Sequence, residues 1–331
     1  MHRFKTGVLR TVILLGSLFV VGCCSVPIPA PPGNYSHWNW PIRQQTAEGL
    51  CVWRSYLVHV PPAAEAADPL PLVLNFHAAF NNGLLQSLYS GMNRKADEEG
   101  FVVVYPDSLG CVWNVTEGET RYGILKLNWN VDDVEFVRLL LDTLQEKLRI
   151  DPRRIYATGF SSGGAMSVRL ASASARGELG VHKIAAIAPV SAGPVPESGK
   201  LQEAYQCPAL REDPVPMRMI ISNNDKTIAG LQDVSVDDVK RRLLELAADY
   251  ARANGCAESA TARKTGKTGW GVLAETITFS SQDGRRETVL DIFDTGGGSN
   301  NGHIWPGPWF GGEFRATDAA WTFFSAHRRP D

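Results

Sequence analysis

The sequence carries almost no excess of charge and no C-x-x-C pair of the kind that binds zinc. Its 331 residues include 33 basic and 35 acidic side chains, which give a formal net charge of −2 at pH 7. Without a basic cluster or an acidic tail, neither a nucleic-acid partner nor a charged disordered region is expected. The spacing of the six cysteines argues against a metal site, and no cofactor is expected.

The N-terminus differs in composition from the rest of the chain. Three basic residues and no acidic residue precede the apolar segment TVILLGSLFVVG, which is typical of a signal peptide and too short for a membrane-spanning helix. The segment leads into VVGC (residues 20–23), which resembles a bacterial lipobox. We therefore expect residues 1–22 to be removed on export and Cys23 to carry a lipid that anchors the protein to a bacterial membrane. The alternative is a plain secretory signal that is cleaved without lipidation.

Residues 23–45 are rich in proline and polar side chains and are expected to form a tether with little structure. The remainder, residues 46–331, has neither an internal repeat nor a change of composition. The whole chain is 44% hydrophobic and 21% charged, an ordinary globular composition. These features predict one folded domain over residues 46–331.

Strand and helix patterns alternate along this domain. Apolar or alternating runs typical of strands cover residues 51–61, 70–76, 100–107, 154–159, 183–193, 216–225 and 287–294. Helical patterns cover residues 84–99, 131–148, 235–256 and 315–329. The alternation predicts an α/β fold, with a mostly parallel sheet covered by helices on both faces.

The stretch ATGFSSGGAMS (residues 157–167) places two serines side by side among glycines. Only Ser161 fits the spacing G-x-S-x-G, because centring the motif on Ser162 would require a glycine where Phe160 stands. A strand pattern precedes the motif and an alanine-rich helix pattern follows it, which is the context of a nucleophile on a sharp turn. The sequence therefore predicts Ser161 as a nucleophile, with a simple Gly/Ser-rich loop as the alternative.

A serine nucleophile needs a histidine base and an acid that orients the histidine. In α/β-hydrolases the acid and then the histidine follow the serine along the chain. Asp225 ends a predicted strand, and His303 lies in a glycine-rich loop after the last strand. His182 precedes that acid and His327 ends the last helix, so the order along the chain selects Ser161, Asp225 and His303.

Several separated blocks together resemble the polyhydroxybutyrate depolymerase and feruloyl esterase group, which includes LpqC-type lipoprotein esterases and secreted carbohydrate esterases. The blocks are PLVLNFHAAF, YPDSLGCVWN, VDDVEFV, RIYATGFSSGGAMS and GHIWPG, and they stand in the family's order over nearly the whole domain. The resemblance implies an α/β-hydrolase fold and a serine carboxylic ester hydrolase that works through an acyl-enzyme. It implies an ester substrate: a hydroxyalkanoate oligomer, a feruloyl-decorated polysaccharide or an acetyl ester. An acyltransferase, a peptidase or a non-catalytic binding lipoprotein on the same scaffold are the alternatives.

The resemblance also implies an oxyanion hole made of backbone N–H groups, one from Ser162 and one from Ala78 or Ala79. The family has glycine at the position of Ala78, and His-Gly where this chain has the asparagines before Asp225. The loop that leads to His303 is longer by the residues SNN. These departures bear on substrate fit and backbone placement, and none of them removes a predicted catalytic residue.

Four further side chains have a functional and a structural interpretation. Trp305 could form an aromatic wall for the acyl group or pack in the core, and Trp113 is similar. His77 could line the oxyanion loop or be a buried, hydrogen-bonded structural histidine. Asp133 is another acid, but its place at the start of a predicted helix favours a structural role.

Four cysteines lie outside the lipobox. An even number of cysteines in an exported chain predicts disulfide bonds. Cys207 and Cys256 flank the segment that carries Asp225, so we expect a Cys207–Cys256 bridge. Cys51 and Cys111 then form the second pair.

Overall fold

The computed structural model describes residues 37–38, 41–46, 49–62, 68–115, 121–122, 125–128, 131–192, 203–257, 259–284, 286–296, 301–307 and 311–330. The predicted signal peptide, Cys23 and most of the predicted tether lie outside the described residues. None of the described helices is both long and apolar enough to cross a membrane.

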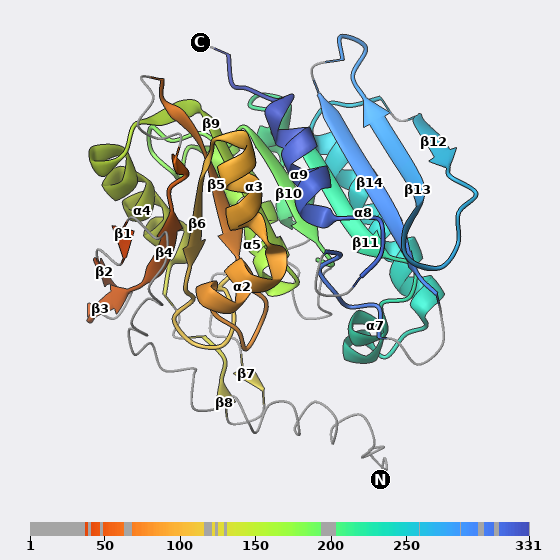
Figure 1. Ribbon diagram of the computed structural model, residues 1–331, viewed down its shortest axis with the longest axis horizontal. Helices are drawn as coiled ribbons and strands as arrows, with labels where there is room; N and C mark the ends of the chain where they lie inside the picture. Colours follow the sequence, from red (N-terminus) through yellow and green to blue (C-terminus); the bar gives the residue numbers. More distant parts are fainter. Residues whose placement is uncertain are drawn as a thin grey trace.

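A ten-stranded sheet forms the centre of the molecule (Figure 1). Its strands lie in the order β1 (His37–Trp38), β4 (Tyr56–His59), β6 (Val102–Pro106), β5 (Leu70–Phe76), β9 (Ile150–Phe160), β10 (Ala186–Val190), β11 (Met217–Ser222), β14 (Glu287–Thr295), β13 (Trp270–Ser280) and β12 (Ala260–Lys264). The strands from β6 to β14 in this order pair in parallel, whereas β1 and β4 at one edge and β13 and β12 at the other pair antiparallel. The predicted mostly parallel sheet is therefore confirmed.

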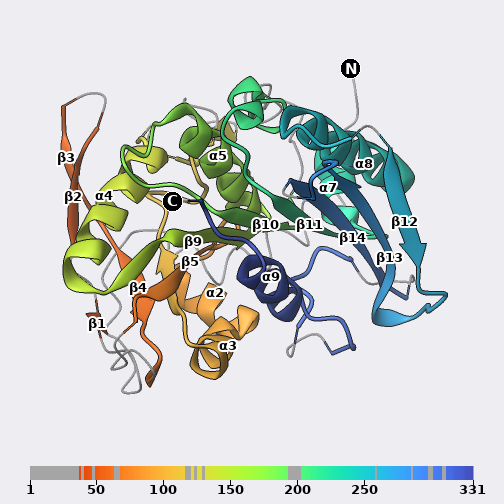
Figure 2. The same ribbon diagram turned by 90° about the horizontal axis from the view of Figure 1, so that it is seen from above.

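Helices cover both faces of this sheet (Figure 2). One face carries α4 (Asp133–Lys147), α5 (Ser162–Arg176) and α8 (Val236–Ala253), and the other carries α2 (Gly83–Ser90), α3 (Met92–Glu99) and α9 (Ala316–Ser325). The described residues also include α7 (Lys226–Gln232), the short 3-10 helix η3 (Pro208–Arg211), and the hairpins β2 (Ile42–Gln45)–β3 (Cys51–Arg54) and β7 (Arg121–Tyr122)–β8 (Leu125–Lys126). Each face has its own buried apolar cluster, because the central strands are apolar on both sides.

Several features differ from the sequence prediction. Residues 42–45 of the predicted tether form β2, and the strand expected over residues 51–61 is divided into β3 and β4, which belong to different sheets. The single helix expected over residues 84–99 is two helices, because Gly91 adopts a left-handed conformation with φ of 62° and ends α2. The hairpin β12–β13 was not predicted. Every residue of β12 is exposed, so the strand has no apolar face for a pattern to reveal.

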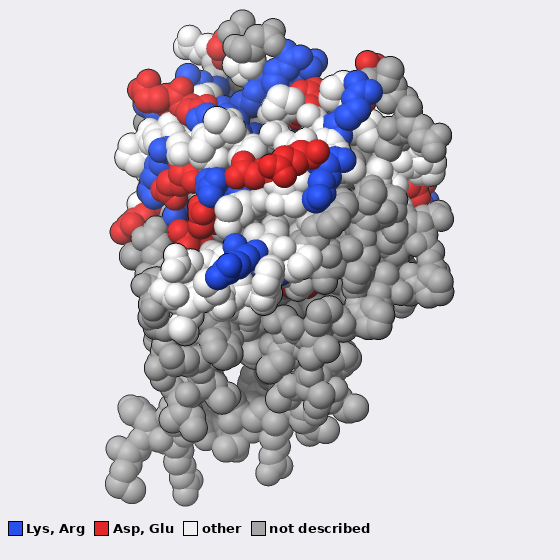
Figure 3. Space-filling view, turned by 90° about the vertical axis from the view of Figure 1, so that its left-hand side faces the viewer, with Lys and Arg blue, Asp and Glu red and all other residues white. Residues whose placement is uncertain are grey.

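Charged side chains of both signs are interspersed over the described surface shown in Figure 3. On α4, for example, Arg138 contacts both Glu135 and Asp142 at 2.6 and 2.8 Å. Such partly exposed pairs contribute little to stability. The described part of this face therefore presents no large field of a single sign.

A buried ion pair joins the N-terminal hairpin to α4. The guanidinium of Arg54 lies 2.6 Å from a carboxylate oxygen of Asp133, and both side chains are 1% exposed. The second oxygen of Asp133 accepts the N–H of Asn114 at 2.7 Å. Asp132, rather than Asp133, caps the helix by accepting the N–H groups of Val134 and Glu135. The structural role predicted for Asp133 is thus an ion pair instead of a cap.

No disulfide bond joins any two of the four described cysteines. Cys207 is buried in the apolar cluster beside α5, whereas the thiol of Cys256 lies 3.9 Å from the hydroxyl of Thr288 on β14. Cys51 is exposed on β3. The predicted Cys207–Cys256 and Cys51–Cys111 bridges are therefore not observed in the structure.

The Asp133→Asn variant tests how much the buried ion pair contributes to the free energy of unfolding. The amide keeps the shape of the carboxylate but leaves the charge of Arg54 buried and uncompensated, so we expect a loss of about 3–5 kcal/mol in the free energy of unfolding. Denaturant unfolding followed by circular dichroism measures it. Glu98→Gln on α3, which removes the carboxylate of an exposed pair with Arg94, is the control and should leave the midpoint nearly unchanged. Equal midpoints for Asp133→Asn and wild type would show that the ion pair contributes nothing.

Candidate active site

Ser161 lies on a strained turn between β9 and α5. Its backbone has φ of 55° and ψ of −115°, a conformation that costs free energy for any residue with a side chain. A Cβ atom at Gly159 would collide with the carbonyl oxygen of Gly163, and one at Gly163 would collide with that of Phe76 on β5. The spacing G-x-S-x-G is thus required by close approach of the backbone on both sides of Ser161.

Asp225 and His303 are brought together from loops far apart in sequence. One carboxylate oxygen of Asp225 lies 2.8 Å from Nδ1 of His303. The other accepts the N–H of Ile228 at 2.9 Å, which caps α7, and the Asp225 residue is 2% exposed. Because a carboxylate only accepts, Nδ1 carries the proton and Nε2 is left as the acceptor.

The imidazole of His303 also lies beside the serine turn. Its ring centroid is 4.9 Å from that of Phe160, the residue before Ser161. Among the described residues no hydrogen bond joins Ser161 Oγ to His303, and such bonds often tighten only when substrate binds. The three residues selected from the sequence therefore lie in one region, with the acid–histidine contact already formed.

Asp294, near the end of β14, is another acid that could in principle pair with a histidine, but its carboxylate is bound by other groups. Burial would raise the pKa of its carboxyl, but N–H groups of Gly269 and Gly296 donate to it and hold the pKa below its ordinary value. The side-chain amide of Asn223 donates to it as well, at 2.8 Å. Asp294 thus orders the turns at the ends of β11, β13 and β14.

The lengthened loop before His303 is fastened to the start of α7. The backbone oxygen of Asn301 accepts the N–H of Lys226 at 2.8 Å, and its side-chain oxygen accepts the hydroxyl of Thr227 at 2.9 Å. The next residue, Gly302, has φ of 75°, and a Cβ there would collide with the backbone of Asn224. Sequence reasoning identified the insertion but not this role of Asn301.

The loop after β5 is held by His77. This residue is 1% exposed, its Nε2 accepts the N–H of Ser108 at 3.0 Å, and its Nδ1 donates to the carbonyl of Ala78 at 2.7 Å. Burial lowers the pKa of the imidazole, which keeps it neutral as this pattern requires. His77 is therefore a hydrogen-bonded structural histidine, one of the two interpretations that the sequence left open.

The contact with His77 also sets the direction of the next N–H group. In a trans peptide the C=O and N–H point in opposite directions, so the Ala79 N–H points away from His77. Among the described residues that N–H has no partner. Ser162 begins α5, where first-turn N–H groups have no partner within the helix.

Trp113 joins these two segments. Its indole N–H donates to the backbone oxygen of His77 at 2.9 Å, and its backbone N–H donates to the hydroxyl of Ser162 at 3.3 Å. Trp305, by contrast, is fully buried and its indole donates to Thr317 on α9. Core packing is therefore the role of Trp305, and the predicted aromatic wall is not observed there.

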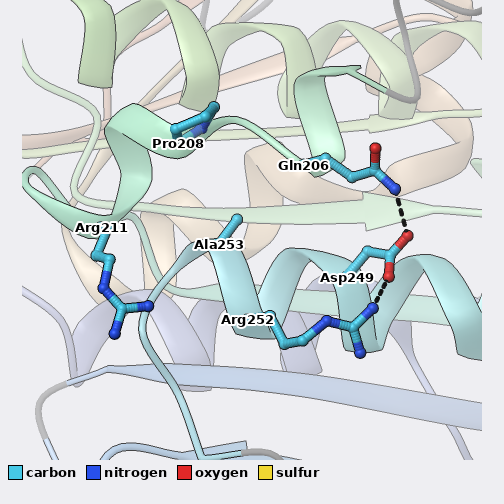
Figure 4. Close-up of a pocket in the computed structure, with 6 residues that line it drawn as sticks. All are labelled: Gln206, Pro208, Arg211, Asp249, Arg252 and Ala253. Carbon is cyan, nitrogen blue, oxygen red and sulfur yellow. Dashed lines mark hydrogen bonds and ion pairs between the residues drawn. The ribbon is translucent and has the colours of Figure 1, made fainter.

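A shallow cavity of about 350 Å³ lies between η3 and α8 (Figure 4). It is lined by Gln206, Pro208, Arg211, Asp249, Arg252 and Ala253. Asp249 is bound there by both Gln206 and Arg252, so the charge of that carboxylate is already balanced. None of the predicted site residues lines this cavity.

Gly302→Ala tests whether the histidine loop depends on close approach. The new methyl group would push the loop away from Asn224 and shift His303, so we expect reaction of Ser161 with a fluorophosphonate to slow by on the order of 10²-fold. Gly266→Ala is the matched control, because Gly266 has a φ of 70° and open space around it. Labelling rates measured by mass spectrometry decide the matter, and equal rates in the two variants would contradict the expected role of the loop.

Comparisons with known proteins agree with this architecture. No protein-family profile matches the chain. NocK of Nocardia uniformis subsp. tsuyamanensis, which is named as an esterase, is 31% identical over 150 residues, which are 45% of this chain and 42% of NocK. Feruloyl esterase B of Piromyces equi is 30% identical over 118 residues, which are 34% of this chain and 20% of that protein. The matches thus span less than half the length of these curated relatives.

The solved structure of an acetyl xylan esterase from Aspergillus awamori is similar to 82% of this chain and to 94% of its own, with a TM-score of 0.54 and 18% identity. At 18% sequence identity, this structural similarity supports a shared fold and nothing beyond it. The resemblance to feruloyl esterases predicted from the sequence is confirmed by the names of the relatives. The chain accordingly has the α/β-hydrolase fold and is similar in sequence to esterases.

Proposed function

We propose that this protein is a serine carboxylic ester hydrolase that forms an acyl-enzyme on Ser161. The observation that carries the proposal is the Asp225–His303 pair beside a serine in a strained turn. Strain of this kind is retained where it serves a function. The protonated Nδ1 of His303 leaves Nε2 free to accept a proton from Ser161, which is the arrangement a general base needs.

In the proposed reaction, His303 Nε2 takes the hydroxyl proton as Ser161 Oγ attacks the ester carbonyl carbon. The negative charge that develops on the carbonyl oxygen is stabilised by the N–H groups of Ser162 and Ala79. Asp225 stabilises the imidazolium. The intermediate collapses, the alkoxide leaves with the proton from His303, and a water molecule repeats the sequence to release the acid and restore Ser161.

For the substrate, we propose acetyl or feruloyl esters of polysaccharides. The support is the names of the relatives and of the structural neighbour, which include a feruloyl esterase and an acetyl xylan esterase. Hydroxyalkanoate oligomers are the other class that the sequence blocks suggested. Hydrolysis of acetylated xylan, methyl ferulate and hydroxybutyrate trimer, compared at equal enzyme concentration, separates these classes.

Ser161→Ala should lose ester hydrolysis almost completely, by roughly 10⁶-fold in kcat as in the subtilisin case. Ser162→Ala is the matched control and should keep substantial activity, because residue 162 supplies its backbone N–H and only a weak side-chain contact to Trp113. The measurement is turnover of p-nitrophenyl acetate together with fluorophosphonate labelling. An inactive Ser162→Ala beside an active Ser161→Ala would overturn the assignment. A wild-type protein that is neither active nor labelled would indicate a non-catalytic role.

We further propose that the protein is exported and anchored by lipid on Cys23. The support is the basic and apolar N-terminus that leads into VVGC. Mass spectrometry of the N-terminus in bacterial membranes should find Cys23 as the first residue, carrying two or three acyl chains, because one chain binds a membrane only marginally. Cys23→Ala should remain unprocessed at this position. An unmodified N-terminus elsewhere would identify an ordinary secreted enzyme.

A further inference from the structure

The cavity between η3 and α8 lies apart from the candidate active site. Asn254, the residue that ends α8, accepts the N–H of Val215 just before β11 through its side-chain oxygen at 2.8 Å. Asp225, by contrast, follows the other end of β11, a strand of six residues that spans about 20 Å. The cavity therefore lies toward the opposite edge of the sheet. Its volume of about 350 Å³ is within the range of sites for small ligands.

The lining of the cavity carries an excess of positive charge. Arg211 and Arg252 contribute two positive charges and Asp249 one negative charge, which leaves +1 among the lining residues. Arg252 is ion-paired with Asp249, whereas Arg211 has neither a hydrogen bond nor an ion pair with any other described residue. Figure 4 shows both guanidinium groups on the same side of the cavity. The uncompensated guanidinium of Arg211 favours a ligand that carries a negative group.

Asp249 holds two of the polar groups of the cavity in place. Its carboxylate accepts the side-chain amide of Gln206 at 2.7 Å and the guanidinium of Arg252 (Figure 4). A guanidinium has five N–H donors and an amide has two, so both side chains keep donors for a ligand. Because these side chains are already ordered, they lose less freedom when a ligand binds.

The negative end of α8 does not oppose a bound anion through free carbonyl groups. The backbone oxygens of Tyr250, Ala251 and Arg252 accept the N–H groups of the three residues that follow the helix. The last turn of α8 therefore presents to the cavity mainly the side chains of Asp249, Arg252 and Ala253.

Acceptors and apolar groups of the cavity narrow the class of ligand. The amide oxygen of Gln206 and the remaining lone pairs of Asp249 repel an anion made only of acceptors, such as phosphate, but they accept hydroxyl groups. Pro208 and Ala253 add small apolar surfaces that suit the C–H groups of a ring. A compact ring with one carboxylate and several hydroxyl groups matches all three kinds of group, and an acidic sugar is such a ring.

We propose that this cavity binds a hexuronic acid residue of a polysaccharide, with its carboxylate on Arg211 and Arg252 and its hydroxyl groups on Gln206 and Asp249. Arginine binds carboxylates through charge-assisted hydrogen bonds that are often bidentate. Since the cavity is separate from Ser161, it holds the polymer and not the ester that reacts. A second point of attachment raises the concentration of the polymer chain at the enzyme. This inference rests on the proposed action on polysaccharide esters.

Affinity electrophoresis in gels that contain glucuronoxylan, a xylan that bears glucuronic acid, measures this binding without any need for turnover. The polymer should retard the wild-type protein, and the same xylan with its carboxyl groups reduced to alcohols should not. Arg211→Gln and Arg252→Gln should each lower the association constant on the order of 10-fold, because each removes a charged hydrogen-bond donor. Arg241→Gln is the matched control: it removes the same charge from an exposed position on α8 outside the cavity and should bind like the wild type.

Hydrolysis of p-nitrophenyl acetate should be the same in these three variants and the wild type, because a small ester does not reach the cavity. Equal retardation by the carboxyl-reduced xylan or by immobilised polyglutamate would overturn the assignment to an acidic sugar. Retardation that persists in Arg211→Gln and Arg252→Gln, or that falls as much in Arg241→Gln, would overturn the site. Hydrolysis without retardation would overturn this proposal alone. Retardation without ester hydrolysis would overturn the proposed function and leave the binding site in place.

Discussion

The close approach of three backbone segments at Ser161 is the constraint on which the site depends. The end of β9, the first turn of α5 and the end of β5 lie so near one another that neither Gly159 nor Gly163 can carry a side chain. This contact forces Ser161 into its strained conformation, and the parallel strands on both sides of β9 hold the turn against relaxation. The other residues of the candidate site are arranged around this turn.

A chain of polar contacts extends this rigidity to the N-terminal hairpin. Arg54 on β3 pairs with Asp133, which holds the backbone of Asn114. The neighbouring Trp113 then binds the loop after β5 and the hydroxyl of Ser162. A hairpin more than a hundred residues before the serine turn is therefore part of what fixes the two N–H groups proposed to stabilise an oxyanion. The coupling is mechanical, since each step is a direct contact between neighbouring groups.

The sequence predicted the parts of the fold that follow from continuous apolar runs and from motif spacing. The range 70–76 coincides with β5, and the placement of Ser161, Asp225 and His303 in one region followed from their order along the chain. The break at Gly91 was missed because the helical pattern continues across it. Whether the cysteines pair could not be read from their positions in the sequence, because pairing depends on the directions of the thiols in space. The contact by which Asn301 anchors the loop that carries His303 could not be predicted either, because it joins segments more than seventy residues apart.

The exposed strand β12 has a consequence for how the protein behaves among its own copies. A sheet edge leaves backbone donors and acceptors open to pairing with another chain. Here the last strand carries Arg263 and Lys264, with Lys267 in the turn that follows. Two such edges brought together would place like charges side by side without a compensating apolar face. The charge on β12 thus opposes edge-to-edge aggregation. It protects the edge of the sheet opposite to the one formed by β1.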